Sequence, residues 1–561
     1  MATQPVESPS QPPKGYFSIW QRLLRGYGPL AVLAVLLVAM SLLVPSKVQK
    51  AATSGPTTTA PGNSAGPAGG ATTGAGATAD SAGSAGSAGA SGTETANGGG
   101  AVAAGAGCPD RAEQVTGDPY SPPCIAFSGE NGGATTKGVT ATEIHVAFRV
   151  LDEKGFQQTL AQLAGANLVD TPDTVRNTVT ALAEYFNKSF QFYGRKIVID
   201  FYNGVGSSTN ELLGQGIDKA EADGDTVASM GDFADLSGAT EPYGDALYKR
   251  QVVGFGVPYL SREWMSSRRP YSWSLATDCS IVTETVADYA LKRLLDQPAI
   301  NAGGALQGQP RVATAIAPDN PWYQECVRAG EDILRANRGG KSWDVAPIAY
   351  QLDLGTMSNQ AANLVPKLQS QGITTIVCGC DPIFPVFLSG AAARAGYFPE
   401  FINIGVALDD FDLVGQLWQP DFVKHSFGIS PLGDDASKPS TQSIGYAAYK
   451  SVRQDEPAFS VDLIYYQMYM FATGIQMAGP TLTPDSFEAG MFAYPKKLGP
   501  AGLWGYGPGD YTPQDDVREI YWDPNTVSQY NSKKGAWVDP NPGARYGKGQ
   551  IPAGVAVSCG C

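Results

Sequence analysis

The residues of this chain that could most readily do chemistry are its eight cysteines, several of which are closely spaced. Two Cys-Gly-Cys triplets occupy residues 378–380 and 559–561. Such triplets could bind a metal, carry out redox chemistry, or staple the C-terminus back to a strand end. Zinc sites prefer wider cysteine spacing and usually recruit histidine, and the chain has only His145 and His425. We therefore predict structural disulfides and no metal site.

The first two cysteines are the easiest to pair. Cys108 and Cys124 flank a short proline-rich loop, and we predict that they form a disulfide. An even number of cysteines is typical of an exported, disulfide-bonded protein. The other cysteines can pair in many ways, and the sequence leaves their pairing open: Cys279, Cys326, Cys378, Cys380, Cys559 and Cys561.

Enzymatic chemistry is poorly supported. Two histidines leave little for acid–base catalysis, and there is no G-x-S-x-G, H-E-x-x-H or P-loop pattern. The pair Gly254 and Gly256 lacks the third glycine of a dinucleotide-binding turn. A net charge of −14 argues against a nucleic-acid partner, which would require a basic surface. We predict a protein that is not an enzyme and carries no cofactor.

Polar and aromatic residues cluster where short apolar strands are predicted to end. In open parallel sheets ligands bind at the carboxyl ends of the strands, and a cleft between two domains is a common pocket. The predicted ligand-binding residues are Arg149, Asp232, Phe233, Tyr259, Thr277, Asp278, Asp319, Trp322, Tyr323, Asp381 and Asp409.

Several of these residues have an alternative structural role. Asp278 and Asp381 could each cap a helix, where the carboxylate accepts a backbone N–H. Trp322 could pack inward behind Pro321 instead of lining a binding wall. Asp409, or its neighbour Asp410, could meet an ammonium group or simply be solvated.

The elements that position these residues alternate between strand and helix. Predicted helices cover 173–190, 210–222, 240–249 and 281–295, from the spacing of their apolar residues. Single helices between strands indicate right-handed crossovers and parallel sheets. We therefore predict an α/β protein with two doubly wound parallel-sheet lobes, joined near residues 258–280. The predicted strands are 143–150, 195–203, 226–232, 251–259, 311–318, 343–350, 373–380 and 400–406.

An apolar segment near the N-terminus indicates where the protein works. Ser41 is the only polar side chain in residues 30–44. We favour an uncleaved transmembrane anchor at 27–45 over a cleaved secretory signal, because no good cleavage site follows. Either interpretation places the rest of the chain outside the cytoplasm. The anchor makes this a single-pass protein of the cell membrane with its C-terminal domain extracytoplasmic.

Composition predicts the N-terminal parts of the domain organisation, and the bounds of the binding domain are those that the family resemblance given below implies. A Gly/Ala/Ser/Thr-rich stretch has too few large apolar residues to form a core and is predicted to be a disordered linker. The predicted parts are a cytoplasmic N-terminus (1–26), the anchor (27–45), the linker (46–107), a cysteine-bearing lead-in (108–136), a two-lobed binding domain (137–540) and a cysteine-containing tail (541–561).

Three stretches resemble a known family. These are TTKGVTATEIHVAF, EYFNKSFQFYGRKIVIDFYN and DPIFPVFLSGAAARAGYFPEFINIG. They resemble the type I periplasmic-binding-protein family, in particular the leucine/isoleucine/valine-binding-like receptors of ABC importers in their actinobacterial, membrane-anchored form. The resemblance implies two lobes linked by three crossovers and an aromatic wall from the loop bearing Trp322. Lobe 1 would hold about 137–276 and 430–515, and lobe 2 about 277–429 and 518–540.

The resemblance implies an extracytoplasmic receptor that captures a small molecule between its lobes. The ligand would be amino-acid-like or another small polar metabolite, and the partner would be an ABC permease. The alternative is an anchored sensor or cell-envelope interaction protein that uses the same clamp without transport.

Overall fold

The computed structural model describes residues 112–151, 159, 162–164, 170–238, 240–256, 258–339, 345–433 and 438–559. All of them belong to one compact unit, Thr93–Cys561. The predicted anchor and linker lie outside the described residues, as do Cys108 and Cys561. Within the described part of the chain, no helix has the length and apolar character needed to span a bilayer.

Lobe 1 is built on a five-stranded parallel sheet in the order β2-β1-β3-β4-β5. Helix α3 (Pro172–Ser189) begins at Thr171, whose side chain accepts the amide of Thr174, and it buries Val179, Leu182 and Phe186 at helical spacing. The strands are β1 (Glu143–Val150), β2 (Lys196–Asn203), β3 (Ala234–Asp235), β4 (Val253–Phe255) and β5 (Ser272–Trp273). The other helices in this stretch are α4 (Ser208–Leu212), α5 (Ile217–Met230), α6 (Glu241–Lys249) and α7 (Arg262–Ser267).

Lobe 2 is built on an eight-stranded sheet whose main path runs β14-β13-β10-β9-β8-β6-β7, with β15 paired to β13. The strands from β6 to β10 are parallel, and β13 joins β10 antiparallel. These strands are β6 (Ala313–Pro318), β7 (Ile348–Tyr350), β8 (Thr375–Cys378), β9 (Glu400–Asn403), β10 (Ser426–Ser430), β13 (Asp516–Val527), β14 (Lys534–Val538) and β15 (Tyr546–Gly547).

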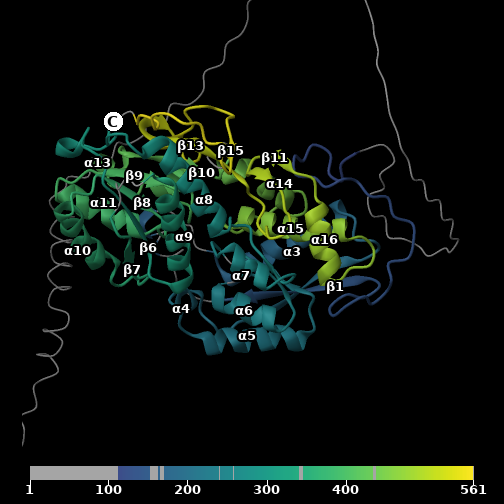
Figure 1. Cartoon of the computed structure of the whole chain (residues 1–561). Helices are drawn as coiled ribbons and strands as arrows, with labels where there is room; N and C mark the ends of the chain where they lie inside the picture. The colour runs from purple at the N-terminus through teal and green to yellow at the C-terminus, as the bar shows by residue number, and fades with distance from the viewer. Residues whose placement is uncertain are drawn as a thin grey trace, which may run out of the picture. The chain divides into compact units, whose positions relative to one another are not determined.

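In lobe 2, single helices connect β6 to β7, β7 to β8 and β8 to β9, as crossover connections do (Figure 1). The helices of this lobe are α8 (Cys279–Tyr289, continued by a π-helical turn at Ala290–Leu294), α9 (Pro321–Asn337), α10 (Met357–Ser370), α11 (Phe384–Arg394), α12 (Asp412–Gly415) and α13 (Pro420–Val423), with a 3₁₀ turn at Gly304–Leu306. The two parallel-sheet lobes predicted from the sequence are thus confirmed.

The chain passes between the lobes three times. It enters lobe 2 between β5 and α8, and returns after β10 to helices that pack on α3 of lobe 1. It crosses again between β12 and β13. The returning elements are a 3₁₀ turn (Ser440–Gln442), α14 (Ile444–Lys450), α15 (Val461–Ala478), α16 (Pro484–Ala493), β11 (Lys497–Gly499) and β12 (Gly502–Trp504).

The second and third crossovers are tied together by a residue of the C-terminal region. The Arg545 guanidinium donates to the carbonyl of Pro431 at 2.6 Å and to the Asp516 carboxylate at 2.7 and 2.8 Å. The first crossover joins them, because the Thr277 hydroxyl donates to Oε1 of Gln514 at 3.3 Å. The three connections therefore form one hydrogen-bonded bundle.

One predicted strand is wrong, and one cysteine pairing that the sequence left open is now assigned. Residues 226–232 are not a strand, because α5 runs to Met230 and buries Ala220, Asp223 and Val227 at helical spacing. The first Cys-Gly-Cys triplet does not staple the C-terminus, because Cys378 is bonded to Cys380.

The other cysteine bonds fit an oxidised protein. Cys279 at the start of α8 is bonded to Cys326 in α9. Cys124 and Cys559 are disulfide-bonded too, so the described residues include no free thiol. The pairing of Cys124 with Cys108 stays a prediction.

Candidate functional site

The two lobes touch at the carboxyl ends of their parallel strands. Tyr259, in the loop after β4 of lobe 1, accepts a hydrogen bond on Oη from the backbone amide of Ala407 in lobe 2 at 2.7 Å. Asn320, after β6, donates through Nδ2 to the carbonyl of Leu212 in lobe 1. These contacts bring the predicted binding edge of each sheet against the other.

Tyr259 and its partner Ala407 both have backbone in the left-handed region. Tyr259 has a φ of 54°, and in the facing loop Gly405, Ala407 and Leu408 have φ values of 71°, 51° and 66°. Such values are unfavourable for residues with a Cβ and cluster at functional sites. The loop that follows β9 is therefore held in a costly conformation at the place where it meets lobe 1.

This loop delivers the most unusual side chain of the molecule. Asp409 is buried, and neither carboxylate oxygen has a hydrogen-bond partner in the described structure. Burial raises the pKa of Asp409 well above its ordinary value, and the nearby carboxylates of Asp381 and Asp410 raise it further. Among the described residues, no donor reaches either oxygen of Asp409.

The neighbouring carboxylates, in contrast, are hydrogen-bonded. Asp381 accepts from the Tyr350 hydroxyl at 2.6 Å and from the backbone amide of Ile383 at 2.8 Å. It is not the N-cap of α11, because that position is Ile383, which makes no side-chain capping bond. Asp410 accepts from the Ser430 hydroxyl. Burial raises the pKa of Asp410 to about 6. Asp409 is thus the member of this acidic cluster with unused acceptor capacity.

Aromatic rings border the same contact. Trp322 and Tyr323, at the start of α9, are half-buried and pack edge to face with ring centroids 6.0 Å apart. The Trp322 ring lies beside Gly214 of lobe 1. Asp319 precedes them and is exposed. The prediction that Trp322 and Tyr323 bind a ligand remains a prediction, and the structure places both rings at the lobe contact.

Arg149 has a different environment from the one predicted. Its guanidinium is buried and donates to both carboxylate oxygens of Glu211 at 3.0 Å and to Oδ2 of Asp223 at 3.2 Å. It also lies 3.7 Å from the centre of the Tyr243 ring. The hydroxyl of Thr240 also donates to Glu211. The charge of Arg149 is therefore balanced within lobe 1.

The remaining predicted residues have structural surroundings: Thr277 lies in the crossover bundle, and Asp232, Phe233 and Asp278 are placed as follows. Asp232 and Phe233 precede β3 and therefore stand at its amino end, and Phe233 packs on Phe471 and Phe487 in the core. Their placement at a carboxyl end is wrong, because it depended on reading the end of α5 as a strand. Asp278 caps α8 by accepting the amide of Ile281 at 2.8 Å.

One site residue was missed. Tyr350 ends β7 and bonds Asp381 through both the hydroxyl proton and the hydroxyl oxygen. It is the last residue of the predicted strand 343–350, so its position at a carboxyl end was a usable signal.

Residues 170–526, more than half of the chain, match the family described as Periplasmic binding protein. The chain belongs to the periplasmic binding protein family. The match confirms the periplasmic-binding-protein family that the resemblance in its sequence predicted.

Solved structures of such binding proteins are similar in fold. A solute-binding protein of Rhodopseudomonas palustris BisB5 in complex with 3,4-dihydroxybenzoic acid is 12% identical, with 72% of this chain and 98% of that chain covered and a TM-score of 0.49. The Brucella ovis leucine-, isoleucine-, valine-, threonine- and alanine-binding protein is 14% identical, with coverages of 74% and 98% and a TM-score of 0.49.

A third solved structure is a fatty acid ABC transporter substrate-binding protein of Thermomonospora curvata. It is 12% identical, with coverages of 76% and 99% and a TM-score of 0.48. No curated protein matches the chain. Because these identities are low, the similarities concern the fold of this periplasmic binding protein and not its ligand.

Proposed function

We propose that this periplasmic binding protein captures a small, amino-acid-like molecule with a cationic group between its lobes and delivers it to an ABC permease. The observation that carries the proposal is Asp409. Its carboxylate is buried in the loop that meets lobe 1, and neither oxygen is hydrogen-bonded to any residue that the structure describes. A buried carboxylate without a partner is unfavourable unless a cation or donor compensates it, and an ammonium group does both.

The surroundings of Asp409 fit a cationic ligand. Asp381 and Asp410 add negative potential, while their own oxygens are already engaged by Tyr350 and Ser430. The half-buried ring of Trp322 gives an apolar surface on which the rest of a small molecule could stack. The proposed ligand therefore carries its positive charge toward lobe 2.

The direct contacts between lobes support a clamp. Tyr259 reaches the β9–α12 loop that holds Asp409, so a ligand bound there would lie beside a residue from each lobe. Domain closure around a ligand, with hinges that absorb the change, is a common transition in two-lobed binding proteins. The disulfides Cys279–Cys326 and Cys378–Cys380 support an oxidising, extracytoplasmic location, with residues 27–45 as the proposed anchor.

The test is a thermal-shift screen of the full chain, followed by calorimetry on the molecules that stabilise it. The screen compares amino acids and amines with benzoates and fatty acids, which lack a cationic group. We expect the stabilising molecules to be cationic and Asp409→Asn to abolish their binding. The matched control is Asp421→Asn, which removes an exposed carboxylate paired with Lys424. Stabilisation by a benzoate, equal in wild type and Asp409→Asn, would overturn the proposal.

A further inference from the structure

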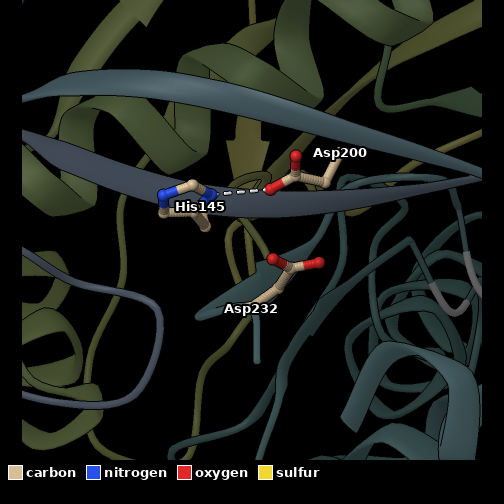
Figure 2. A group of neighbouring side chains, drawn as sticks. All are labelled: His145, Asp200 and Asp232. Carbon is tan, nitrogen blue, oxygen red and sulfur yellow. Dashed lines mark hydrogen bonds and ion pairs between the residues drawn. The ribbon is translucent and has the colours of Figure 1, made fainter. Parts of the chain in front are cut away.

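Three ionisable side chains of lobe 1 come together toward the amino ends of its parallel strands. The proposed ligand site lies at the carboxyl ends. His145 lies in β1, Asp200 in β2, and Asp232 two residues before β3, and these strands are neighbours in the sheet. Val198 stands opposite His145 in the parallel register, so Asp200, two residues further along β2, points to the same face as His145. Three neighbouring strands thus present their side chains to one point (Figure 2).

The distances within this group suit metal ligation. One donor atom from each of His145, Asp200 and Asp232 lies within 4.8 Å of the other two. Nδ1 of His145 and Oδ2 of Asp200 are hydrogen-bonded at 2.7 Å, and a metal ion would take the place of the proton between them (Figure 2). An imidazole nitrogen and two carboxylate oxygens form a donor set that Zn²⁺ accepts, with a further position left for water.

The carboxylate of Asp232 supplies a second indication of a ligand at this place. Its side chain is almost fully buried, with 1% of the residue exposed, and Oδ2 has no hydrogen-bond partner in the described structure. Figure 2 shows its carboxylate turned toward His145 and Asp200. A buried, unsatisfied carboxylate that faces a second carboxylate is unfavourable unless a cation or a shared proton lies between them. The exposed Lys137 interacts electrostatically with Asp232 but leaves that oxygen without a bond.

The other side of the imidazole is arranged as at a zinc site. Nε2 of His145 lies 3.4 Å from Oε2 of Glu143, and Glu143 pairs with Lys196 at 3.2 Å. Metal-ligating histidines commonly donate their second ring N–H to a carboxylate, which fixes the tautomer that leaves the first nitrogen free for the metal. Glu143 thus lies on the Nε2 side of the ring, where it could accept that N–H when Nδ1 binds a metal ion.

We propose that His145, Asp200 and Asp232 form a Zn²⁺ site that joins three strands at the amino edge of lobe 1. The site is separate from Asp409, which belongs to lobe 2. It adjoins the segment that leads into β1, because His145 donates its backbone amide to the carbonyl of Gly138 at 2.8 Å. A bound ion would fix this lead-in to the sheet and thus stabilise the start of the folded domain.

The experiment is a titration of the full chain with Zn²⁺ alone, after treatment with a chelator and removal of the chelator. Calorimetry and thermal shift are recorded for wild type and for Asp232→Asn, Asp200→Asn and His145→Gln. We expect one site per chain, a rise in melting temperature with Zn²⁺, and loss of both in each variant. Glu143→Gln should keep the site and weaken Zn²⁺ binding by about tenfold or more. Asp173→Asn, which alters an exposed carboxylate on α3, is the control that should bind as wild type does.

Two results would overturn the proposal. One is a wild-type affinity for Zn²⁺ no higher than that of His145→Gln, which would assign any binding to other groups of the chain. The other is an Asp232→Asn variant more stable than wild type at every Zn²⁺ concentration, which would identify a proton and not a metal between the carboxylates. If Asp232→Asn does not fold, the partly exposed His145 and Asp200 give variants that answer the same question.

Discussion

Lobe 1 and lobe 2 both bury several charged side chains at their strand ends, but they treat the charges differently. In lobe 1, the guanidinium of Arg149 forms ion pairs of 3.0–3.2 Å with the carboxylates of Glu211 and Asp223, so these buried negative charges have a positive partner. In lobe 2, Asp409 lies among other carboxylates and none of its oxygens is bonded in the described structure. A buried ion group that is complete holds the fold together, whereas an incomplete one implies a partner from outside.

The largest expected effect comes from breaking the complete group. Arg149→Met should lower the free energy of unfolding by about 3–5 kcal/mol, because it leaves Glu211 and Asp223 buried without a counter-charge. Urea unfolding measures this, with Arg335→Met on an exposed stretch of α9 as the control. The control should lie within about 0.5 kcal/mol of wild type. A loss as small as the control's would show that the lobe 1 group is not a structural ion network.

The pH dependence of stability tests the carboxylate cluster of lobe 2 through Asp410. Burial raises the pKa of Asp410 from 3.8 to about 6 in the folded protein. The folded state therefore binds more protons than the unfolded state between these values, and stability falls as pH rises through that window. Urea unfolding gives the difference in unfolding free energy between Asp410→Asn and wild type. This difference should be about 2 kcal/mol more favourable to the variant at pH 7 than at pH 4. An equal difference at both pH values would contradict a buried, destabilised carboxylate.

Trp322 tests whether the incomplete group belongs to a binding site. The ring is only half-buried at the lobe contact, so Trp322→Ala should leave most of the stability intact. For a ligand found in the screen, we expect binding to weaken by about 1–3 kcal/mol, as when an aromatic anchor is lost. Calorimetry and unfolding are measured on the same variant. Early unfolding, by about 3–5 kcal/mol, with normal binding would instead identify a core residue.

The smallest expected effect concerns the hydrogen bond between the lobes. Tyr259→Phe removes the acceptor for the Ala407 amide and should cost about 0.5–1.5 kcal/mol of unfolding free energy. Small-angle scattering should also show a larger radius of gyration for the ligand-free variant. Tyr248→Phe, on α6 of lobe 1, is the matched control and should leave the scattering curve unchanged. Identical curves for Tyr259→Phe and wild type would show that this bond does not hold the lobes together.

Much of the fold could be predicted because local sequence and tertiary structure agree. Residues 143–150 alternate β-branched side chains and form β1 as expected, and the helix expected at 173–190 is α3. The failure at 226–232 has a physical reason. Val227 lies on the same helix face as Ala220 and Asp223, and so continues a helical period over a stretch too short to distinguish from a strand.

The candidate site could be predicted only in part. Strand ends pointed to Tyr259 and Asp409, because the carboxyl edge of a parallel sheet follows from topology. The sequence could not show that Asp409 lacks a partner, since this depends on which side chains fold against it. His145, Asp200 and Asp232 were out of reach for the same reason: they are far apart in the chain, and the strand order brings them together.

The hydrogen-bonded bundle of crossovers has a mechanical consequence. Arg545 joins Pro431 to Asp516, and Thr277 joins the first connection to the third through Gln514. These bonds link the three connections, so a change of backbone conformation in one of them bears on the other two. Under the proposed function, closure on a ligand is then a concerted change at all three connections, and a partner that touches both lobes would meet different surfaces on the loaded and the empty protein.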